Sequence, residues 1–363
     1  VRRCKPLWYG SAQIPMTAMK LLSLRICIAG LLAVVLGSAA VQAARLDDLF
    51  QQRVQAAGRD NASRNDALQR ALQQVLVRVT GSTAVLQEPG ARSLLREPGP
   101  FVQQFRFTQD ASGALSLWVQ FDGVALAKDI RAAGLPYWGA DRPDVLLWLA
   151  VDNRGQRFLV SEPDNSQAAR AALQAARLRG LPVTLPLMDL QDQRAIAFTD
   201  VWGGFASNIE SASQRYRPQM ILVGKLDRSS AGGGWRSDWD LLGAGSNQSW
   251  TTHAANLDEA VGQGIADATE WLALRYALVA ADASARILVV EGIRGLKDYA
   301  RVLKYLSSLT PVDRVQVIRV ADQEVEFNLT LNADERNLLQ VIRLGRTLRA
   351  VEDPSSWRFR VGP

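Results

Sequence analysis

Apolar side chains recur every three or four residues over residues 63–79, the spacing of one buried helix face. This stripe consists of Leu68, Ala71, Leu72, Val75, Leu76 and Val79. Gly81 follows it and predicts the end of the helix, because glycine readily adopts the left-handed conformation of a helix C-terminus. Residues 45–57 fit either a short strand or a helix, and we favour a strand.

Two strand-like segments follow a proline-containing loop. Residues 101–108 and 114–121 are separated by a short polar segment that contains Gly113, which is typical of a hairpin. Asp122 predicts the N-cap of a helix that reaches about Ala133.

The middle of the chain alternates buried strands with helices. Residues 145–151 and 220–226 are continuous apolar runs, which is typical of strands buried on both faces. Around them we predict a helix at 166–179, a short strand at 182–187, and a helix within 201–216 beyond the Gly203-Gly204 pair. This alternation indicates an α/β layer.

An antiparallel extension follows that layer. Residues 235–242 and 248–253 alternate around a glycine-containing turn. Asn256, with Glu259 three residues on, then predicts the start of a long helix.

The last part of the chain predicts the order β-α-β-β-α-β of a split ferredoxin-like unit. The predicted elements are strand 287–291, helix 296–309, strands 312–320 and 324–331, a helix from Asn332 to about Gly345, and a final strand from 348–351 or 357–361.

The predicted fold class is therefore α/β and α+β in several modules, with a central mixed α/β sheet domain and a C-terminal split β-α-β ferredoxin-like module. The expected division is an N-terminal extension plus signal peptide at 1–43, an N-terminal α+β module at 44–140, a central α/β domain at 141–283, and a C-terminal β-α-β-β-α-β module at 284–363.

The segment before residue 44 has the features of a cleavable export signal. Positive residues at 20–25 precede the apolar residues 26–36, and Val41-Gln42-Ala43 is a small-residue cleavage site. The alternative is a membrane anchor, but the apolar run is well short of the roughly 20 residues that a spanning helix needs. We expect cleavage after Ala43, a start at Met16 or Met19 rather than Val1, and a periplasmic mature chain without an anchor.

Processing changes the charge and cysteine content of the chain. The 42 Lys and Arg exceed the 36 Asp and Glu, but five basic residues and no acidic residue lie in 1–43. The mature chain is therefore close to neutral, which argues against a nucleic-acid partner. Cys4 and Cys27 also lie in this segment, so a cysteine-free mature chain is expected, without disulfides or thiolate metal sites.

Motifs of nucleotide binding and nucleophilic catalysis are missing. The chain has no phosphate-binding G-x-x-x-x-G-K-[ST] loop and no G-x-S-x-G nucleophile elbow. Its one histidine, His253, excludes a multi-histidine metal site. We expect no cofactor and no metal, and we identify no catalytic residue.

A carboxylate pair leaves a hydrolase as an alternative. Asp238 and Asp240 share one face of a predicted strand, and paired carboxylates hydrolyse glycosidic bonds. The competing interpretation is a solvated strand face above a buried tryptophan stripe.

Tryptophan supplies the candidate binding residues. Four of the chain's ten tryptophans lie within fifty residues: Trp202, Trp235, Trp239 and Trp250. Indole rings stack on glycans and anchor protein interfaces, although core packing accounts for many of them.

Three stretches resemble the domain-of-unknown-function 2066 family of uncharacterised gammaproteobacterial exported proteins. They are residues 64–81, residues 201–205 (Val-Trp-Gly-Gly-Phe), and residues 216–226 leading to 234–241. The resemblance implies an envelope location and carries no catalytic residues. We expect a periplasmic, envelope-associated accessory or interaction protein that binds an envelope protein or cell-wall glycan and is not an enzyme. The alternatives are a carboxylate-dependent periplasmic hydrolase acting on glycan, and a small-ligand carrier. The sequence predicts no oligomeric state.

Overall fold

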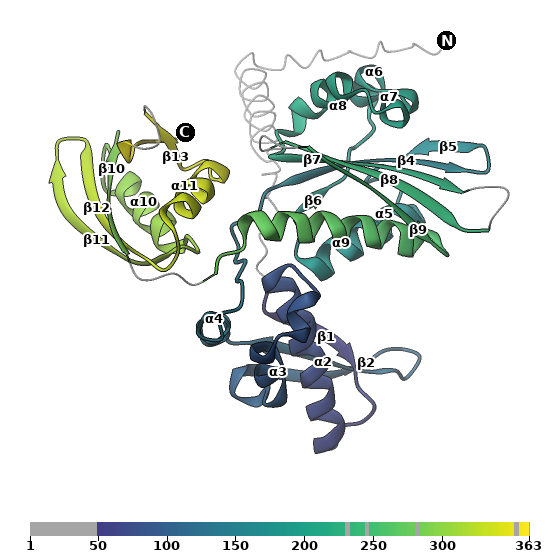
Figure 1. Cartoon of the computed structure of the whole chain (residues 1–363), viewed down its shortest axis with the longest axis horizontal. Helices are drawn as coiled ribbons and strands as arrows, with labels where there is room; N and C mark the ends of the chain where they lie inside the picture. The colour runs from purple at the N-terminus through teal and green to yellow at the C-terminus, as the bar shows by residue number, and fades with distance from the viewer. Residues whose placement is uncertain (1–48, 229–232, 244–246, 280–283, 352–355, 363) are drawn as a thin grey trace, which may run out of the picture. The chain divides into compact units, whose positions relative to one another are not determined.

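The computed structural model describes residues 49–228, 233–243, 247–279, 284–351 and 356–362. The predicted signal peptide, its cleavage site and both cysteines lie outside these residues. Residues Leu46–Pro363 form one compact unit, and its described strands make three sheets flanked by helices (Figure 1). The predicted combination of α/β and α+β elements in several modules is confirmed.

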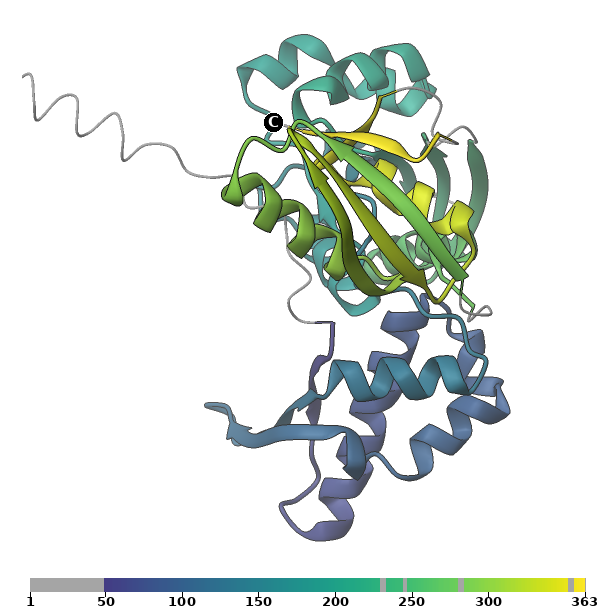
Figure 2. The same ribbon diagram turned by 90° about the vertical axis from the view of Figure 1, so that its left-hand side faces the viewer.

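The first sheet is antiparallel and has the order β1-β3-β2. Its strands are β1 (Gln51–Gln55), β2 (Val102–Gln109) and β3 (Leu115–Phe121). The helices α2 (Asn61–Thr80), α3 (Pro89–Arg96) and α4 (Gly123–Ala132) pack on it (Figure 2). Asp122 caps α4 as predicted, since its Oδ1 accepts from the backbone N–H of Val124 at 2.9 Å. Helix α3 occupies part of the proline-containing segment that we expected to be a loop, with Pro89 in its first turn, where a missing N–H costs nothing.

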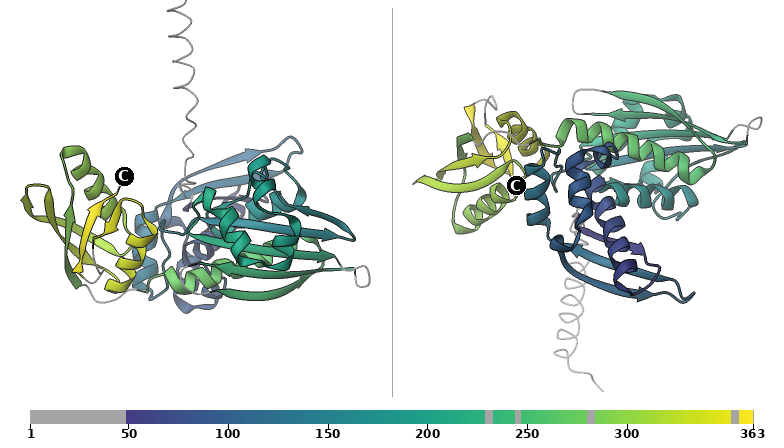
Figure 3. Two further views of the ribbon diagram at one scale, coloured as in Figure 1. Left: turned by 90° about the horizontal axis from the view of Figure 1, so that it is seen from above. Right: turned by 60° about the horizontal axis from the view of Figure 1, so that its bottom comes forward.

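The central sheet has the order β5-β4-β7-β8-β9, and β6 pairs with β4. Its strands are β4 (Val145–Asn153), β5 (Gln156–Leu159), β6 (Val183–Thr184), β7 (Met220–Arg228), β8 (Trp235–Leu242) and β9 (Gln248–Ala254). Strand β4 runs parallel to β6 and β7, and the other pairs are antiparallel. The long strands lie side by side in Figure 3.

Helices cover both faces of this sheet. On one face lie α5 (Gln167–Arg179) and α9 (Leu257–Tyr276); on the other lie α6 (Leu190–Ala195), α7 (Phe198–Gly203) and α8 (Ala206–Ser213) (Figure 1). Strand β4 is buried between the two layers, as its continuous apolar run predicts. One expectation was wrong here, because β6 is shorter than 182–187. The glycine pair ends α7 at Gly204, which has φ 69°, and α8 begins beyond it as expected.

The C-terminal sheet has the order β11-β12-β10-β14-β13. Its strands are β10 (Ser284–Glu291), β11 (Val312–Ala321), β12 (Glu324–Leu331), β13 (Leu348–Ala350) and β14 (Arg358–Val361). The helices α10 (Leu296–Ser308) and α11 (Glu335–Leu344) pack on one face of it (Figure 1). Strand β12 lies between β10 and β11, which is the predicted split β-α-β arrangement.

The end of this unit differs from the expectation in two ways. Both candidate final strands form, and β14 runs parallel to β10 and separates it from β13. The N-cap of α11 is Asp334 rather than Asn332, because Asp334 Oδ1 accepts from the backbone N–H of Arg336 at 2.8 Å.

A buried arginine joins the ends of two helices. The guanidinium of Arg142 donates to the carbonyl oxygens of Gly139, Arg179, Gly180, Arg78 and Trp138 over distances of 2.7–3.1 Å. Arg78 is in the last turn of α2, and Arg179 ends α5. Burial lowers the pKa of Arg142 to about 9, so the group stays charged at neutral pH. The partial negative charge at helix C-termini stabilises such a cation.

Candidate functional site

The structure places three of the four tryptophans that the sequence singles out on one side of the central sheet and Trp202 on the other. Trp235 and Trp239 are 6% and 1% exposed and pack in the core under α9. Trp250, across from Trp239 on β9, stacks on it with 6.4 Å between ring centroids. Trp202 packs with the other layer and stacks on Phe198 at 5.2 Å. The four rings therefore do not form one binding surface, and Trp235 and Trp239 are core residues.

The burial of Trp239 depends on a glycine of α9. A Cβ atom at Gly264 would lie 1.9 Å from the indole of Trp239. The helix backbone approaches the ring this closely only because Gly264 has no side chain.

Asp238 and Asp240 lie on the opposite face of β8, and each already has partners. Asp238 accepts from Thr251 Oγ1 at 2.6 Å and from Arg236 at 3.1 Å. Asp240 accepts from Ser249 Oγ at 2.6 Å and pairs with Lys225 at 3.2 Å.

Electrostatics also disfavour this pair as catalytic acids. Burial pushes the pKa of Asp238 upward, but the hydrogen bonds from Thr251 and Arg236 outweigh it, and the pKa is lowered overall. A glycosidase needs one carboxyl group with a raised pKa to protonate the leaving group. Nothing in the surroundings of Asp238 supplies that property.

His253 lies exposed on β9, opposite Arg236 of β8. Within the described residues, no group of three or more His, Cys, Asp or Glu side chains could hold a metal ion. The same part of the chain contains no helix with the length and apolar character needed to cross a bilayer.

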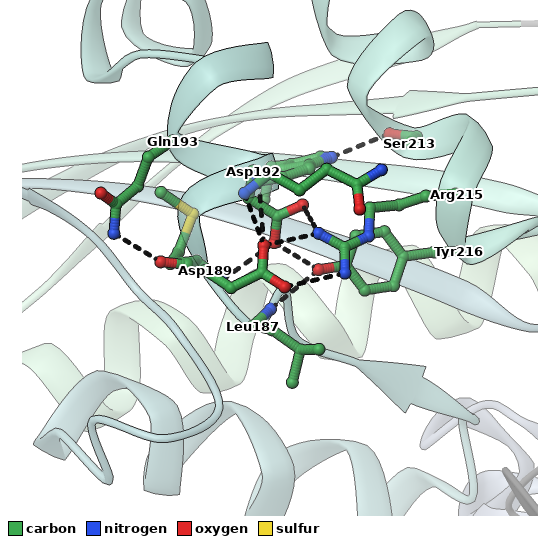
Figure 4. Close-up of polar contacts among 10 residues, drawn as sticks. Leu187, Asp189, Asp192, Gln193, Ser213, Arg215 and Tyr216 are labelled. Atoms are coloured by element: carbon green, nitrogen blue, oxygen red, sulfur yellow. Dashed lines mark hydrogen bonds and ion pairs between the residues drawn. The ribbon is translucent and has the colours of Figure 1, made fainter. Parts of the chain in front are cut away.

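A buried carboxylate organises the segment between β6 and β7. Asp192 of α6 has no exposed side-chain surface and lies within a network drawn in Figure 4. Its Oδ1 accepts from Arg215 Nη1 at 2.7 Å. Its Oδ2 accepts from the hydroxyl of Tyr216 and from the backbone N–H of Met188 at 2.9 Å.

Asp189 completes the network at the start of α6. Its Oδ1 accepts from the backbone N–H of Asp192 at 3.1 Å, which caps the helix. Arg215 donates to both of its carboxylate oxygens, at 2.7 and 3.0 Å. This bidentate pair holds the pKa of Asp189 well below its usual range, with the backbone N–H of Asp192 as a further cause.

Tyr216 is held from two directions. Its hydroxyl donates to Asp192 and accepts from the backbone N–H of Leu187 at 2.9 Å. Burial and the neighbouring carboxylate raise its pKa to about 12. The ring packs edge-on against Trp148, whose Nε1 donates to Ser213 at 2.8 Å.

The network fixes a segment that carries apolar side chains on its outer side. Leu187 is 42% exposed, Leu190 71% and Phe205 55%. Met188 has φ 51°, a left-handed conformation that disfavours a bulky residue and is retained only where surrounding contacts impose it. We call Leu187, Leu190 and Phe205 the α6–α8 surface.

A pocket of about 490 Å³ adjoins the α6–α8 surface. Its lining includes Leu187, Met188, Ile196 and Phe198, together with Asp164. The pocket thus combines an apolar wall with one exposed carboxylate that makes no ion pair in the part of the chain that the structure describes.

No pattern in the sequence predicts this site. Asp192 bonds to residues 23 and 24 positions away, and such separations leave no local pattern. The visible signal was Asp189 three residues before Asp192, an acidic N-cap followed by an acid in the first turn.

A known family matches the N-terminal part of the chain. The family model of the domain of unknown function DUF8605 matches residues 43–139. The chain has no match among the curated proteins. Residues 43–139, which include the first sheet and its helices, therefore form an uncharacterised domain.

Proposed function

We propose that the protein is a periplasmic, envelope-associated interaction protein that binds its partner at the α6–α8 surface. One observation carries the proposal: Leu187, Leu190 and Phe205 stay exposed on a segment that buried polar contacts hold rigid. A rigid apolar surface loses little conformational entropy on binding and suits a protein contact.

The surroundings of that surface define the chemistry of the partner. Glu162 and Asp164 are exposed beside the pocket, and neither forms an ion pair within the described ranges. Leu187 and Phe198 line the same pocket. The partner is therefore a protein segment with an apolar side chain that enters the pocket and a neighbouring Lys or Arg that faces these carboxylates.

Site-specific cross-linking in cells tests the surface. A photoreactive phenylalanine analogue at Leu190 or Phe205 should give the same cross-linked protein. A probe at Leu296, an exposed leucine on α10, is the matched control and should not give that product. Equal products at Leu296, or none at Leu190 and Phe205, would refute the proposal.

The charge of the partner is tested separately. Glu162→Gln together with Asp164→Asn should lower the cross-linking yield at Leu190 while the melting temperature stays unchanged. The cross-linked peptide, sequenced by mass spectrometry, should contain an apolar residue beside Lys or Arg. A peptide with an acidic residue at that place would contradict the assignment.

The proposal includes the periplasmic location of the protein and its membership of the domain-of-unknown-function 2066 family. The apolar run at 26–36 and the cleavage site at Ala43 support export, and the three stretches that resemble the domain-of-unknown-function 2066 family support an envelope role. Recovered protein should begin at Ala44, as read by N-terminal mass spectrometry. Recovery of protein that retains residues 26–36 would show that the segment is not removed.

A further inference from the structure

A second pocket, of about 580 Å³, carries four arginines. Its lining includes Arg217, and Arg343, Arg346 and Arg349 from the end of α11 and the start of β13. The wall between them is apolar and includes the half-buried Leu339 and Leu344 and the exposed Ala350.

These arginines have no acidic partner in the described part of the chain. None of the four forms an ion pair within 4.0 Å there. Arg346 donates to the carbonyl oxygen of Arg217 at 3.4 Å, and the half-buried Asp144 lies close enough to Arg346 to feel its charge. One carboxylate outside the lining does not balance four guanidinium groups.

Ordinary structural roles account for only part of the cluster. Arg343 lies in the last turn of α11, where its positive charge interacts favourably with the helix dipole. Arg349 and Arg217 have no such explanation. Arg217 even holds φ 50°, a left-handed conformation that costs a residue with a Cβ energy.

The chemistry of the lining indicates its ligand. Guanidinium groups bind phosphoryl oxygens through paired hydrogen bonds and keep their charge at every physiological pH. The volume is that of a pocket for an organic ligand and far exceeds a bare phosphate ion. The apolar wall requires an apolar substituent next to the anionic group.

We propose that this pocket binds the phosphoryl group of an organic phosphate ester, with the ester's apolar part against Leu339, Leu344 and Ala350. Two sources carry this chemistry: a phospholipid headgroup with the first carbons of its chains, and a soluble phosphate ester. The pocket is distinct from the α6–α8 surface, and the inference does not depend on the proposed function.

Titration calorimetry with the purified chain tests the inference. The probes are inorganic phosphate, glycerol 3-phosphate and a short-chain soluble phosphatidic acid. The phosphatidic acid should bind at least about tenfold more tightly than inorganic phosphate, because only it fills the apolar wall. Equal affinity for all three, or no binding of any, would overturn the proposal.

Variants separate the pocket from general positive charge. Arg343→Gln with Arg349→Gln should weaken phosphatidic acid binding by at least about tenfold, since each lost charged hydrogen bond is worth that much. Arg336→Gln, on the exposed side of α11, removes one charge and is the matched control for Arg343→Gln alone; it should bind like the wild type, whereas Arg343→Gln should not. An equal loss in Arg336→Gln would reduce the effect to net charge and refute the site.

A variant that fills the pocket tests whether binding depends on the shape of the pocket as well as on its charge. Ala350→Trp keeps all four arginines and places a bulky ring at the pocket wall, so it should abolish phosphatidic acid binding. Wild-type affinity in this variant would refute the pocket. Vesicles of phosphatidylglycerol in phosphatidylcholine then identify the source: retention that Arg343→Gln with Arg349→Gln removes assigns a lipid headgroup, and binding of the soluble esters alone assigns a soluble phosphate ester.

Discussion

Tyr216 donates its hydroxyl hydrogen to Asp192, whose carboxylate has no exposed surface. Arg215 donates to the other carboxylate oxygen, so an ion pair lies inside the layer formed by α6 and α8. A buried charge is tolerated only when every oxygen has partners. The α6–α8 surface is therefore only as stable as this network.

Asp192→Ala should destabilise the protein by about 3 kcal/mol, because it leaves Arg215 and Tyr216 without their shared acceptor. Urea denaturation measures the change. Asp164→Ala removes an exposed carboxylate from the neighbouring pocket and should stay within about 0.5 kcal/mol of the wild type. Equal effects of the two changes would show that the network is not stabilising.

Tyr216 should ionise near pH 12, where an exposed tyrosine ionises near 10. A raised pKa in the folded state means that the unfolded chain loses this proton first. Stability is therefore intact below pH 10 and declines as pH rises toward about 12. In Tyr216→Phe this part of the decline should vanish, as seen by comparing urea midpoints of the two proteins at about pH 9 and about pH 11. Parallel midpoint changes in both proteins would contradict the assignment.

Two glycines of α9 should respond to alanine in opposite directions. Gly264→Ala should cost about 1–3 kcal/mol, since its Cβ would meet Trp239 at 1.9 Å. A Cβ at Gly262 meets nothing within 4 Å, so Gly262→Ala should stabilise the helix by about 0.5–1 kcal/mol. Thermal melts of both variants decide this, and destabilisation by Gly262→Ala would show that α9 is packed differently.

Asp189→Asn should make the protein less sensitive to acid. The pKa of Asp189 is lowered in the folded state, so its stabilisation is present above pH 3.8 and is lost as pH falls further. Asparagine also caps helices, which leaves the start of α6 intact and removes only the charge pair with Arg215. The variant should unfold earlier than the wild type at pH 7, and the difference should narrow progressively as pH falls below 3.8 in urea titrations. A constant difference across this range would exclude the ionic contribution.

Long helices and strands were predictable because the pattern that defines each one lies entirely within its own residues. Helix α2 and strand β4 each repeat one spacing or one apolar run over their whole length. Helices α3 and α6 span only 8 and 6 residues, too few for a periodic stripe to emerge. The place of β14 beside β10 depends on a pairing across about 70 residues, which no local pattern encodes.

Local sequence patterns predict only part of the candidate site as well. Alternation along β8 correctly places Trp235 and Trp239 on one side and Asp238 and Asp240 on the other. It contains no information on which side α9 covers, and that decides whether the indoles are core or binding residues. The contacts of Asp192 with Arg215 and Tyr216 join segments that follow β6 and precede β7, two strands that both pair with β4.

The hydrogen bonds of Arg142 affect which residues can be substituted in related proteins. All five of its N–H groups donate to main-chain carbonyl oxygens, so these hydrogen bonds do not require any particular side chain at the acceptor residues. A substitution at Arg179 that keeps the backbone path leaves its carbonyl acceptor in place. In related chains, position 142 should thus stay arginine while the residue at 179 varies, and methods that detect contacts from correlated substitutions would not find this contact.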